Sequence, residues 1–156
     1  LGLLINTAGL LLFTNDGALA HRLMHPGSEI PREYWVRVAG DVSESTLEAL
    51  RHGLELEDGF ARFDDIVPLQ ALHEDDSQYN RYFSVTLKEG RNREVRRLWE
   101  AVGCRVSRLK RIRFGNLYLP KELAQGRYRL LTPGETNALL EPLRQKKGPV
   151  RTPGPR

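Results

Sequence analysis

Cysteine, long apolar runs and internal repeats are almost missing from this sequence of 156 residues. The single cysteine, Cys104, excludes an internal disulfide and gives no support for a cysteine-rich metal site. No run of about 18 apolar residues occurs, so no membrane-spanning helix is expected. The apolar opening lacks a basic leader region and is untypical of a signal peptide. These absences lead us to expect a cytoplasmic protein.

Positive charge is in excess, and it is unevenly distributed. The formal net charge is +4. Aspartate and glutamate are concentrated in residues 41–76, whereas arginine and lysine are concentrated in residues 81–113 and after 143. Length and composition fit one globular domain with a real core. The segregation of charge predicts a face that binds a polyanion, most simply nucleic acid.

The densest group of cations lies in residues 89–103, EGRNREVRRLWEAVG. Apolar residues at i, i+3, i+4 and i+7 predict a helix face that is buried, and Gly103 stands where the helix would end. These residues are Val95, Leu98, Trp99 and Val102. Cations near a helix N-terminus oppose the helix dipole. We therefore expect an anionic partner or a buried carboxylate; a solvated face with nearby glutamates as partners is the alternative.

Period-two and period-3.6 patterns predict the elements of a sheet and its helices. Strands are expected at 9–14, 32–38, 81–87 and 126–131, as a pair within 55–67, and as two more within 104–119. Helices are expected at 18–24, at 43–53 behind Ser43, in the arginine segment, and from Pro133 behind Thr132. Hairpin connections without regular strand–helix alternation predict an α+β fold. Its sheet would be mixed and mainly antiparallel, with flanking helices.

Three other segments have their own interpretation. Asn15-Asp16-Gly17 predicts a tight turn. His21 and His25 have a spacing that metal sites use, but no third ligand is suggested nearby, so we expect no metal. Residues 144–156 contain five cations, no acid and repeated Pro and Gly. They predict a flexible basic tail that either strengthens RNA binding or acts as a solubilising end.

Six sequence motifs follow one another along the chain: GLLLFTNDG, RLMHP, EYWVRV, EGRNREVRRLWEAVG, RLKRIRFG and GRYRLLTPGE. Together they resemble the catalytic domain of bacterial ribosomal RNA pseudouridine synthases of the small-subunit type A group, and most closely the B-type enzymes that act on the large subunit. The resemblance covers residues 1 to about 140. We therefore expect a catalytic domain at 1–143, with its first strands missing, and the tail at 144–156.

The resemblance implies a reaction and a partner. A specific uridine of large-subunit (23S) ribosomal RNA would become pseudouridine, because uracil is detached from ribose, rotated and rejoined through C5. No cofactor or metal is implied, and the partner is ribosomal RNA. The target base must leave its stack before this chemistry, which calls for an aromatic platform.

The resemblance also assigns roles to residues. Tyr34 matches the tyrosine that stacks on the flipped base and is a candidate for removing the C5 proton. Arg96 matches the arginine that pairs with a catalytic aspartate, because a carboxylate in a dry pocket needs a cation to stay ionised. Leu109 is a candidate for the pocket wall. The candidates for RNA binding, with plain surface charge as the alternative, are Arg91, Arg93, Arg97, Lys110, Arg111 and Arg113.

The first residues of the sequence depart from the family pattern. The catalytic loop of the family places its aspartate where this sequence has Leu4, and its arginine where this sequence has Gly2. Leu4 offers no oxygen, and Asp16, the nearest acid, fits a turn better. Taken literally, the chain should be inactive. An incomplete sequence, mis-assigned first residues and a non-catalytic RNA-binding relative all remain open. The sequence gives no indication of oligomeric state.

Overall fold

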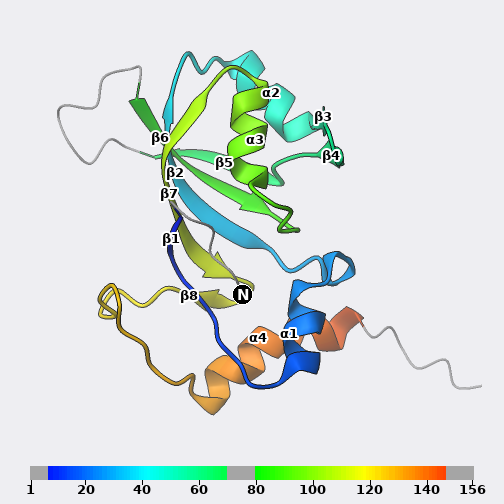
Figure 1. The fold of residues 1–156 in the computed structure, drawn as a ribbon, viewed down its shortest axis with the longest axis vertical. Helices are drawn as coiled ribbons and strands as arrows, with labels where there is room; N and C mark the ends of the chain where they lie inside the picture. Colours follow the sequence, from blue (N-terminus) through cyan, green and yellow to red (C-terminus); the bar gives the residue numbers. More distant parts are fainter. Residues whose placement is uncertain (1–6, 70–79, 147–156) are drawn as a thin grey trace, which may run out of the picture.

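A computed structural model describes residues 7–69 and 80–146 (Figure 1). Its centre is a sheet with the strand order β1-β7-β2-β6-β5, and β8 pairs with β7. The strands are β1 (Ala8–Gly9), β2 (Arg32–Ala39), β5 (Asp65–Leu69), β6 (Asn80–Leu87), β7 (Arg105–Phe114) and β8 (Leu117–Tyr118). Only the β1–β7 pairing among these is parallel. The expected α+β fold with a mainly antiparallel sheet is confirmed.

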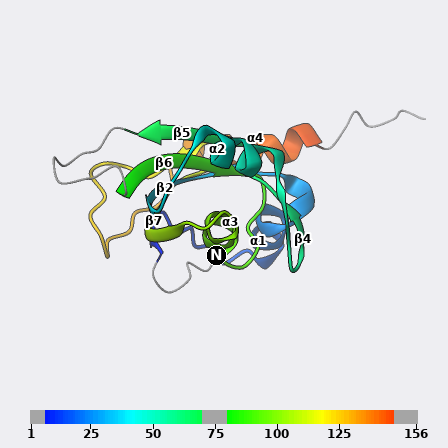
Figure 2. The same ribbon diagram turned by 90° about the horizontal axis from the view of Figure 1, so that it is seen from above.

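Four α-helices and a small hairpin surround the sheet. The helices are α1 (Gly17–Met24), α2 (Glu44–His52), α3 (Glu94–Ala101) and α4 (Pro133–Lys146), with a short 3-10 helix at Pro26–Ser28. Strands β3 (Leu54–Leu56) and β4 (Gly59–Ala61) form a separate hairpin, which corresponds to the strand pair predicted within 55–67. Figure 2 shows α3 in the hollow of the curved sheet, and Figure 1 shows α1 and α4 at its other end. No helix among the described residues is long and apolar enough to cross a membrane.

The main core lies between the sheet and helices α2 and α3. Val36 and Val85, from neighbouring strands, belong to the same buried cluster as Leu98 and Trp99 of α3. Trp99 is fully buried, and its ring centroid lies 5.2 Å from that of Phe83. The buried helix face predicted for the arginine segment is therefore confirmed. A second cluster joins α1 and α4 to the ends of β7 and β8 through Leu23, Phe114, Leu117, Leu139 and Leu143.

Strand alternation gives the sheet two different sides. Val36 and Val38 of β2 point into the core, on the side we call the helix face. Trp35 and Arg37 alternate with them on the other side, which we call the open face. Trp35 is 42% exposed. The alternation predicted for this strand is thus confirmed.

Two predicted strands are wrong. Of the segment 9–14, only Gly9 belongs to a strand, because β1 (Ala8–Gly9) pairs with β7 at two positions before the chain turns toward α1. The segment 126–131 is not a strand. Tyr128 and Leu130 are each 86% exposed, and no strand pairs with this segment within the described residues. Apolar alternation produces a strand only where a partner strand lies alongside.

Helix ends confirm some predictions and correct others. Ser43 caps α2, and the Thr132 hydroxyl accepts from the Glu135 amide at the start of α4. Asp16, predicted to lie in a tight turn, is the N-cap of α1 and accepts from the Leu19 amide. Helix α4 continues to Lys146, so the boundary predicted at 143/144 falls inside it. Most of the predicted tail, and residues 70–79 of the acidic region, lie outside the described residues.

The arginine helix begins later than predicted. Helix α3 starts at Glu94, so Arg91 and Arg93 precede it. Arg93 is the N-cap residue with φ of 52°, in the left-handed region that non-glycine residues rarely adopt. At the other end, Gly103 has φ of 81° and ends the segment as predicted. The turn at Arg93 therefore separates the first two arginines of the segment from the helix.

Candidate nucleotide-binding pocket

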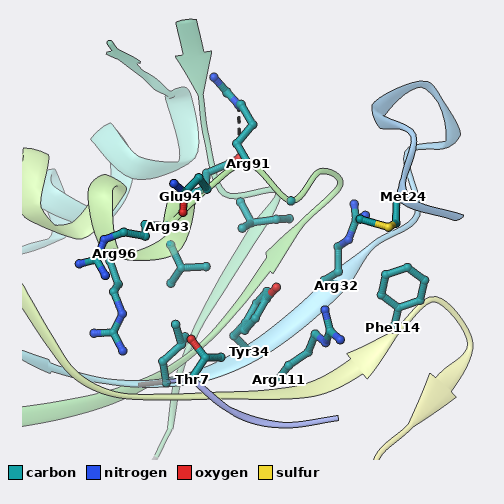
Figure 3. A pocket seen from close by; sticks show the side chains of 15 residues that line it. Thr7, Met24, Arg32, Tyr34, Arg91, Arg93, Glu94, Arg96, Arg111 and Phe114 are labelled. Atoms are coloured by element: carbon teal, nitrogen blue, oxygen red, sulfur yellow. Dashed lines mark ion pairs between the residues drawn. The ribbon is translucent and has the colours of Figure 1, made fainter. Parts of the chain in front are cut away.

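A cavity of about 390 Å³ lies between the helix face of the sheet and the start of α3 (Figure 3). Strands β2 and β7 supply one wall, which includes Arg32, Tyr34, Leu109 and Arg111. The loop before α3 and its first turn supply the other wall, which includes Gly90, Arg91, Asn92, Arg93, Glu94 and Arg96. Thr7, Met24 and Phe114 are among the remaining lining residues. Five arginines and one carboxyl thus surround the space.

Tyr34 and Arg111 lie side by side because they are register partners in β2 and β7. Arg111 is 7% exposed, and its Nε donates to the Leu10 carbonyl at 2.9 Å. Its Nη2 is buried and has no hydrogen-bond partner among the described residues. Burying a charged donor without a partner is costly. The pocket therefore presents a cationic N–H suited to an acceptor on a ligand.

Arg32 is a second buried cation beside the first. It is 5% exposed, and its Nη1 donates to the Ile30 carbonyl at 3.1 Å. Its guanidinium lies 5.1 Å from the centroid of the Phe114 ring, and that of Arg111 lies 5.6 Å from the same ring. Burial lowers the pKa of Arg32. Two cations around one ring repel each other, so an anionic ligand would be favoured here.

A glycine makes the position of Arg111 possible. Gly9 has φ of 102°, and a Cβ built on it would clash with the backbone of Arg111. Only glycine lets β1 approach β7 this closely. That approach brings the Leu10 carbonyl to the Arg111 side chain.

Glu94 is the buried carboxyl of the pocket. It is 2% exposed, and Arg91 Nε lies 3.5 Å from its Oε2 as an ion pair. Neither oxygen has a hydrogen-bond partner among the described residues. Burial, and after it the neighbouring Glu89 carboxyl, raises the pKa of Glu94 to about 7. The wall opposite Tyr34 therefore contains a group that changes its protonation near neutral pH.

The arginines of α3 point in different directions. Arg96 lines the pocket, and its Nη1 donates to the Val106 carbonyl at 3.0 Å. Burial lowers the pKa of Arg96. Arg97 instead forms a bidentate pair with Asp58, at 2.7 and 2.9 Å, and so ties α3 to the β3–β4 turn. Arg91 also reaches Asp58, at 3.3 Å.

The pocket contains some of the predicted site residues. Those that line it are Tyr34, Arg91, Arg93, Arg96, Leu109 and Arg111. Arg97 is held by Asp58. Lys110 lies on the open face by strand alternation. Arg113 lies there because the β2–β7 register shifts by one residue between Tyr34 and Glu33, which makes Arg113 the partner of Glu33. Leu4 lies outside the described residues. The roles assigned to these residues remain predictions.

Sequence reasoning missed Arg32, Glu94, Thr7, Met24 and Phe114. The spacing of Arg32 and Tyr34, two apart on one strand, was a usable signal that both face the same side. Within the described chain, no group of three metal-ligating side chains occurs. His25 Nδ1 accepts from the Gly27 amide at 3.0 Å, which is a local capping role.

Comparison with known proteins agrees with the fold. The RNA pseudouridylate synthase family matches residues 5–101. That is more than half of the chain, and the chain belongs to this family.

Two relatives match most of the chain. A Pseudomonas aeruginosa protein named ribosomal large subunit pseudouridine synthase B is 51% identical over 150 residues, covering 96% of this chain and 37% of that protein. An Escherichia coli K12 protein of the same name is 53% identical over 137 residues, covering 88% and 45%. The chain thus spans less than half the length of these relatives. They agree with the resemblance to the B-type enzymes and give no support to the small-subunit type A group.

A solved structure shows the same fold. The chain is similar to a crystal structure of a pseudouridylate synthase with a TM-score of 0.66 and 29% identity. The match covers 81% of this chain and 52% of that one.

Proposed function

We propose that this chain supplies the pocket of an enzyme that converts a uridine of large-subunit ribosomal RNA to pseudouridine in the cytoplasm. The observation that carries the proposal is the placement of Tyr34 beside the buried cations Arg32 and Arg111 in a chain of this family. The named relatives support the choice of ribosomal RNA.

The pocket suits a nucleotide that has left its stack. A volume of about 390 Å³ is in the range of ligand pockets. The ring of Tyr34 offers a stacking surface, and stacking on an aromatic ring is worth about 1–3 kcal/mol per base. Extruding a base costs a few kcal/mol, so stacking offsets much of that cost. Arg111 Nη2 would donate to a carbonyl or phosphate oxygen of the bound nucleotide.

The reaction proposed is an isomerisation and needs no outside reactant. The bond from ribose C1′ to uracil N1 breaks, and a bond from C1′ to C5 forms. The C5 proton leaves, and N1 gains a proton. Tyr34 is the proposed acceptor of the C5 proton. Arg96 is the proposed partner of the carboxylate that the family pattern places at position 4, where this sequence has leucine.

A chimera tests the proposal. In the chimera, residues 7–146 of this chain would replace the matching segment of the Pseudomonas aeruginosa relative. Position 4, ahead of that segment, would carry either the leucine of this chain or the substitution Leu4→Asp. After incubation with a large-subunit ribosomal RNA transcript, pseudouridine is measured by carbodiimide labelling. We expect product from the Leu4→Asp chimera and none from the Leu4 chimera. No product from Leu4→Asp, with the intact relative active in parallel, would contradict the proposal.

The second candidate function is RNA binding without catalysis. Leu4 favours it, because a leucine cannot act as nucleophile or as partner to Arg96. Both functions predict RNA binding, so affinity does not separate them. The Leu4→Asp chimera does, because a non-catalytic pocket would form no product even with the carboxylate restored.

A further inference from the structure

The open face carries aromatic rings and cations on three neighbouring strands. The group, which we call the aromatic-basic patch, consists of Trp35, Arg37, Tyr82, Arg108 and Lys110. Strand register arranges it in two rows. In one row Trp35 is opposite Lys110, and in the next Arg37 stands between Tyr82 and Arg108.

This patch is not covered in the way that the helix face is. Trp35 is 42% exposed, and Arg108 and Lys110 are exposed. Side chains of α2 and α3 belong to the core on the helix face, and Figure 2 shows α3 in the hollow on that side. A tryptophan that remains exposed in the middle of a sheet leaves apolar area in contact with water. If the residue served only the stability of the fold, that area would be buried.

The arrangement of charge on the patch also lowers the stability of the chain when no partner is bound. Arg37 stands directly opposite Arg108, and like charges opposite each other across strands destabilise a sheet. Among the strand residues that the structure describes, the carboxylates of this face are Glu33 and Asp65, and they belong to the next row. Glu33 Oε2 already lies 3.9 Å from Arg113 Nε. The exposed cations Arg108 and Lys110 therefore favour an anionic partner.

Rings and cations continue beyond the patch along the same face. Arg113 is the register partner of Tyr118 in β8, and its guanidinium lies 5.8 Å from the Tyr118 ring centroid. Tyr118 is 62% exposed. The open face thus offers a third ring with an adjacent cation.

We propose that the aromatic-basic patch is a second RNA-binding surface, which stacks bases of a single-stranded segment on Trp35 and Tyr82 and contacts its phosphates through Arg37, Arg108 and Lys110. Trp35 is exposed and Tyr82 is partly buried. Accessible rings with interspersed cations on a sheet are a common way to bind single-stranded RNA. Protein interfaces are depleted in lysine and place their charges at the rim, whereas here cations stand among the rings. The proposal rests on the proposed function, because the RNA is the same substrate.

The patch and the pocket are built on the same strands. Trp35 follows Tyr34, and Lys110 precedes Arg111, so neighbouring residues point to opposite faces. The pocket would hold one extruded nucleotide, while the patch would hold a flanking single strand without reading its sequence. The second surface would raise affinity and leave the choice of uridine to other contacts.

Tryptophan fluorescence gives a direct test on the full chain. Trp99 is fully buried, so Trp35 is the tryptophan that a stacking base can reach. The probe is a ten-nucleotide oligouridylate titrated at low salt. We expect the oligonucleotide to quench the emission, and we expect Trp35→Phe, which keeps a ring, to abolish the quench. Persistence of the quench in Trp35→Phe would overturn the proposal.

Affinity for the same oligonucleotide, labelled with fluorescein, tests the cations. Arg108→Ala with Lys110→Ala should reduce the slope of log affinity against log salt by about 0.7 for each phosphate that is no longer neutralised. Trp35→Ala should weaken binding about tenfold, as loss of one stacked base does. The matched control is Arg22→Ala with Lys121→Ala, which removes the same charge from exposed positions elsewhere.

The outcomes separate this proposal from the proposed function. If the Arg108/Lys110 double variant binds like the Arg22/Lys121 control while Arg111→Ala weakens binding, the patch is not an RNA surface and the pocket proposal stands. If the patch variants lose affinity and slope but the Leu4→Asp chimera forms no product, the patch stands and the proposed function fails.

Discussion

The two faces of the sheet hold cations in opposite ways. On the helix face, Arg32 and Arg111 are 5% and 7% exposed, donate to backbone carbonyls and share the ring of Phe114. On the open face, Arg108 and Lys110 are exposed. Burial fixes a guanidinium in one geometry, which suits a single nucleotide. Exposure leaves a cation adaptable, which suits a chain of phosphates.

The largest expected effect is the difference in stability between alanine variants of the two tryptophans. Trp99→Ala should lower the free energy of unfolding by about 3–5 kcal/mol, because it removes a fully buried ring packed between Phe63 and Phe83. Trp35→Ala on the open face should lower it by less than about 1 kcal/mol. Urea denaturation followed by circular dichroism measures both. Equal losses would mean that the open face is as well packed as the helix face.

A smaller effect concerns the buried carboxyl of the helix face. The pKa of Glu94 is raised to about 7, so the folded state holds a proton that the unfolded state has lost between about pH 4.5 and 7. Stability should therefore fall as pH rises through that window. Glu94→Gln should remove this dependence and stabilise the chain at pH 8 by about 1–3 kcal/mol relative to its effect at pH 5.

Urea denaturation from pH 5 to 8 checks this pH dependence. The control is Glu100→Gln, an exposed carboxyl on the same helix, which should leave the profile unchanged. A wild-type stability that rises from pH 5 to 8, or the same profile in both variants, would show that Glu94 is not a buried acid of raised pKa.

The smallest expected effect lies at the rim of the helix face. Asp58→Asn removes the bidentate partner of Arg97, and hydrogen bonding to Arg97 lowers the pKa of Asp58. Because this pair is partly exposed and screened by salt, the melting temperature should fall by only about 1–2 °C at low salt and be unchanged at 1 M NaCl. A loss that persists at 1 M NaCl would mean that Asp58 stabilises the β3–β4 turn by a route other than charge.

Elements that depend on local pattern could be predicted from the sequence. The alternation in 32–38, the cap at Ser43 and the apolar series from Val95 to Val102 all specify their elements within a few residues. The segments 9–14 and 126–131 could not be judged in this way, because a strand exists only with a partner. Neither partner is visible in the local sequence.

The site was predictable to a similar extent. Tyr34 and Arg96 stand in recognisable strings, and the structure brings both to one cavity. Arg32 and Glu94 were missed because charged residues are expected at the surface, and their burial depends on Phe114 and on the turn at Arg93. Arg97 looked like its neighbour Arg96, but one step along a helix turns a side chain by about 100°.

Gly9 has a consequence for anyone who redesigns this pocket. The orientation of Arg111 depends on the Leu10 carbonyl, and that carbonyl is in reach only because position 9 has no side chain. Every substitution there would push the first strand outward and release the guanidinium. A mutational library aimed at substrate preference can therefore vary the walls of the cavity, but it must leave this one position untouched.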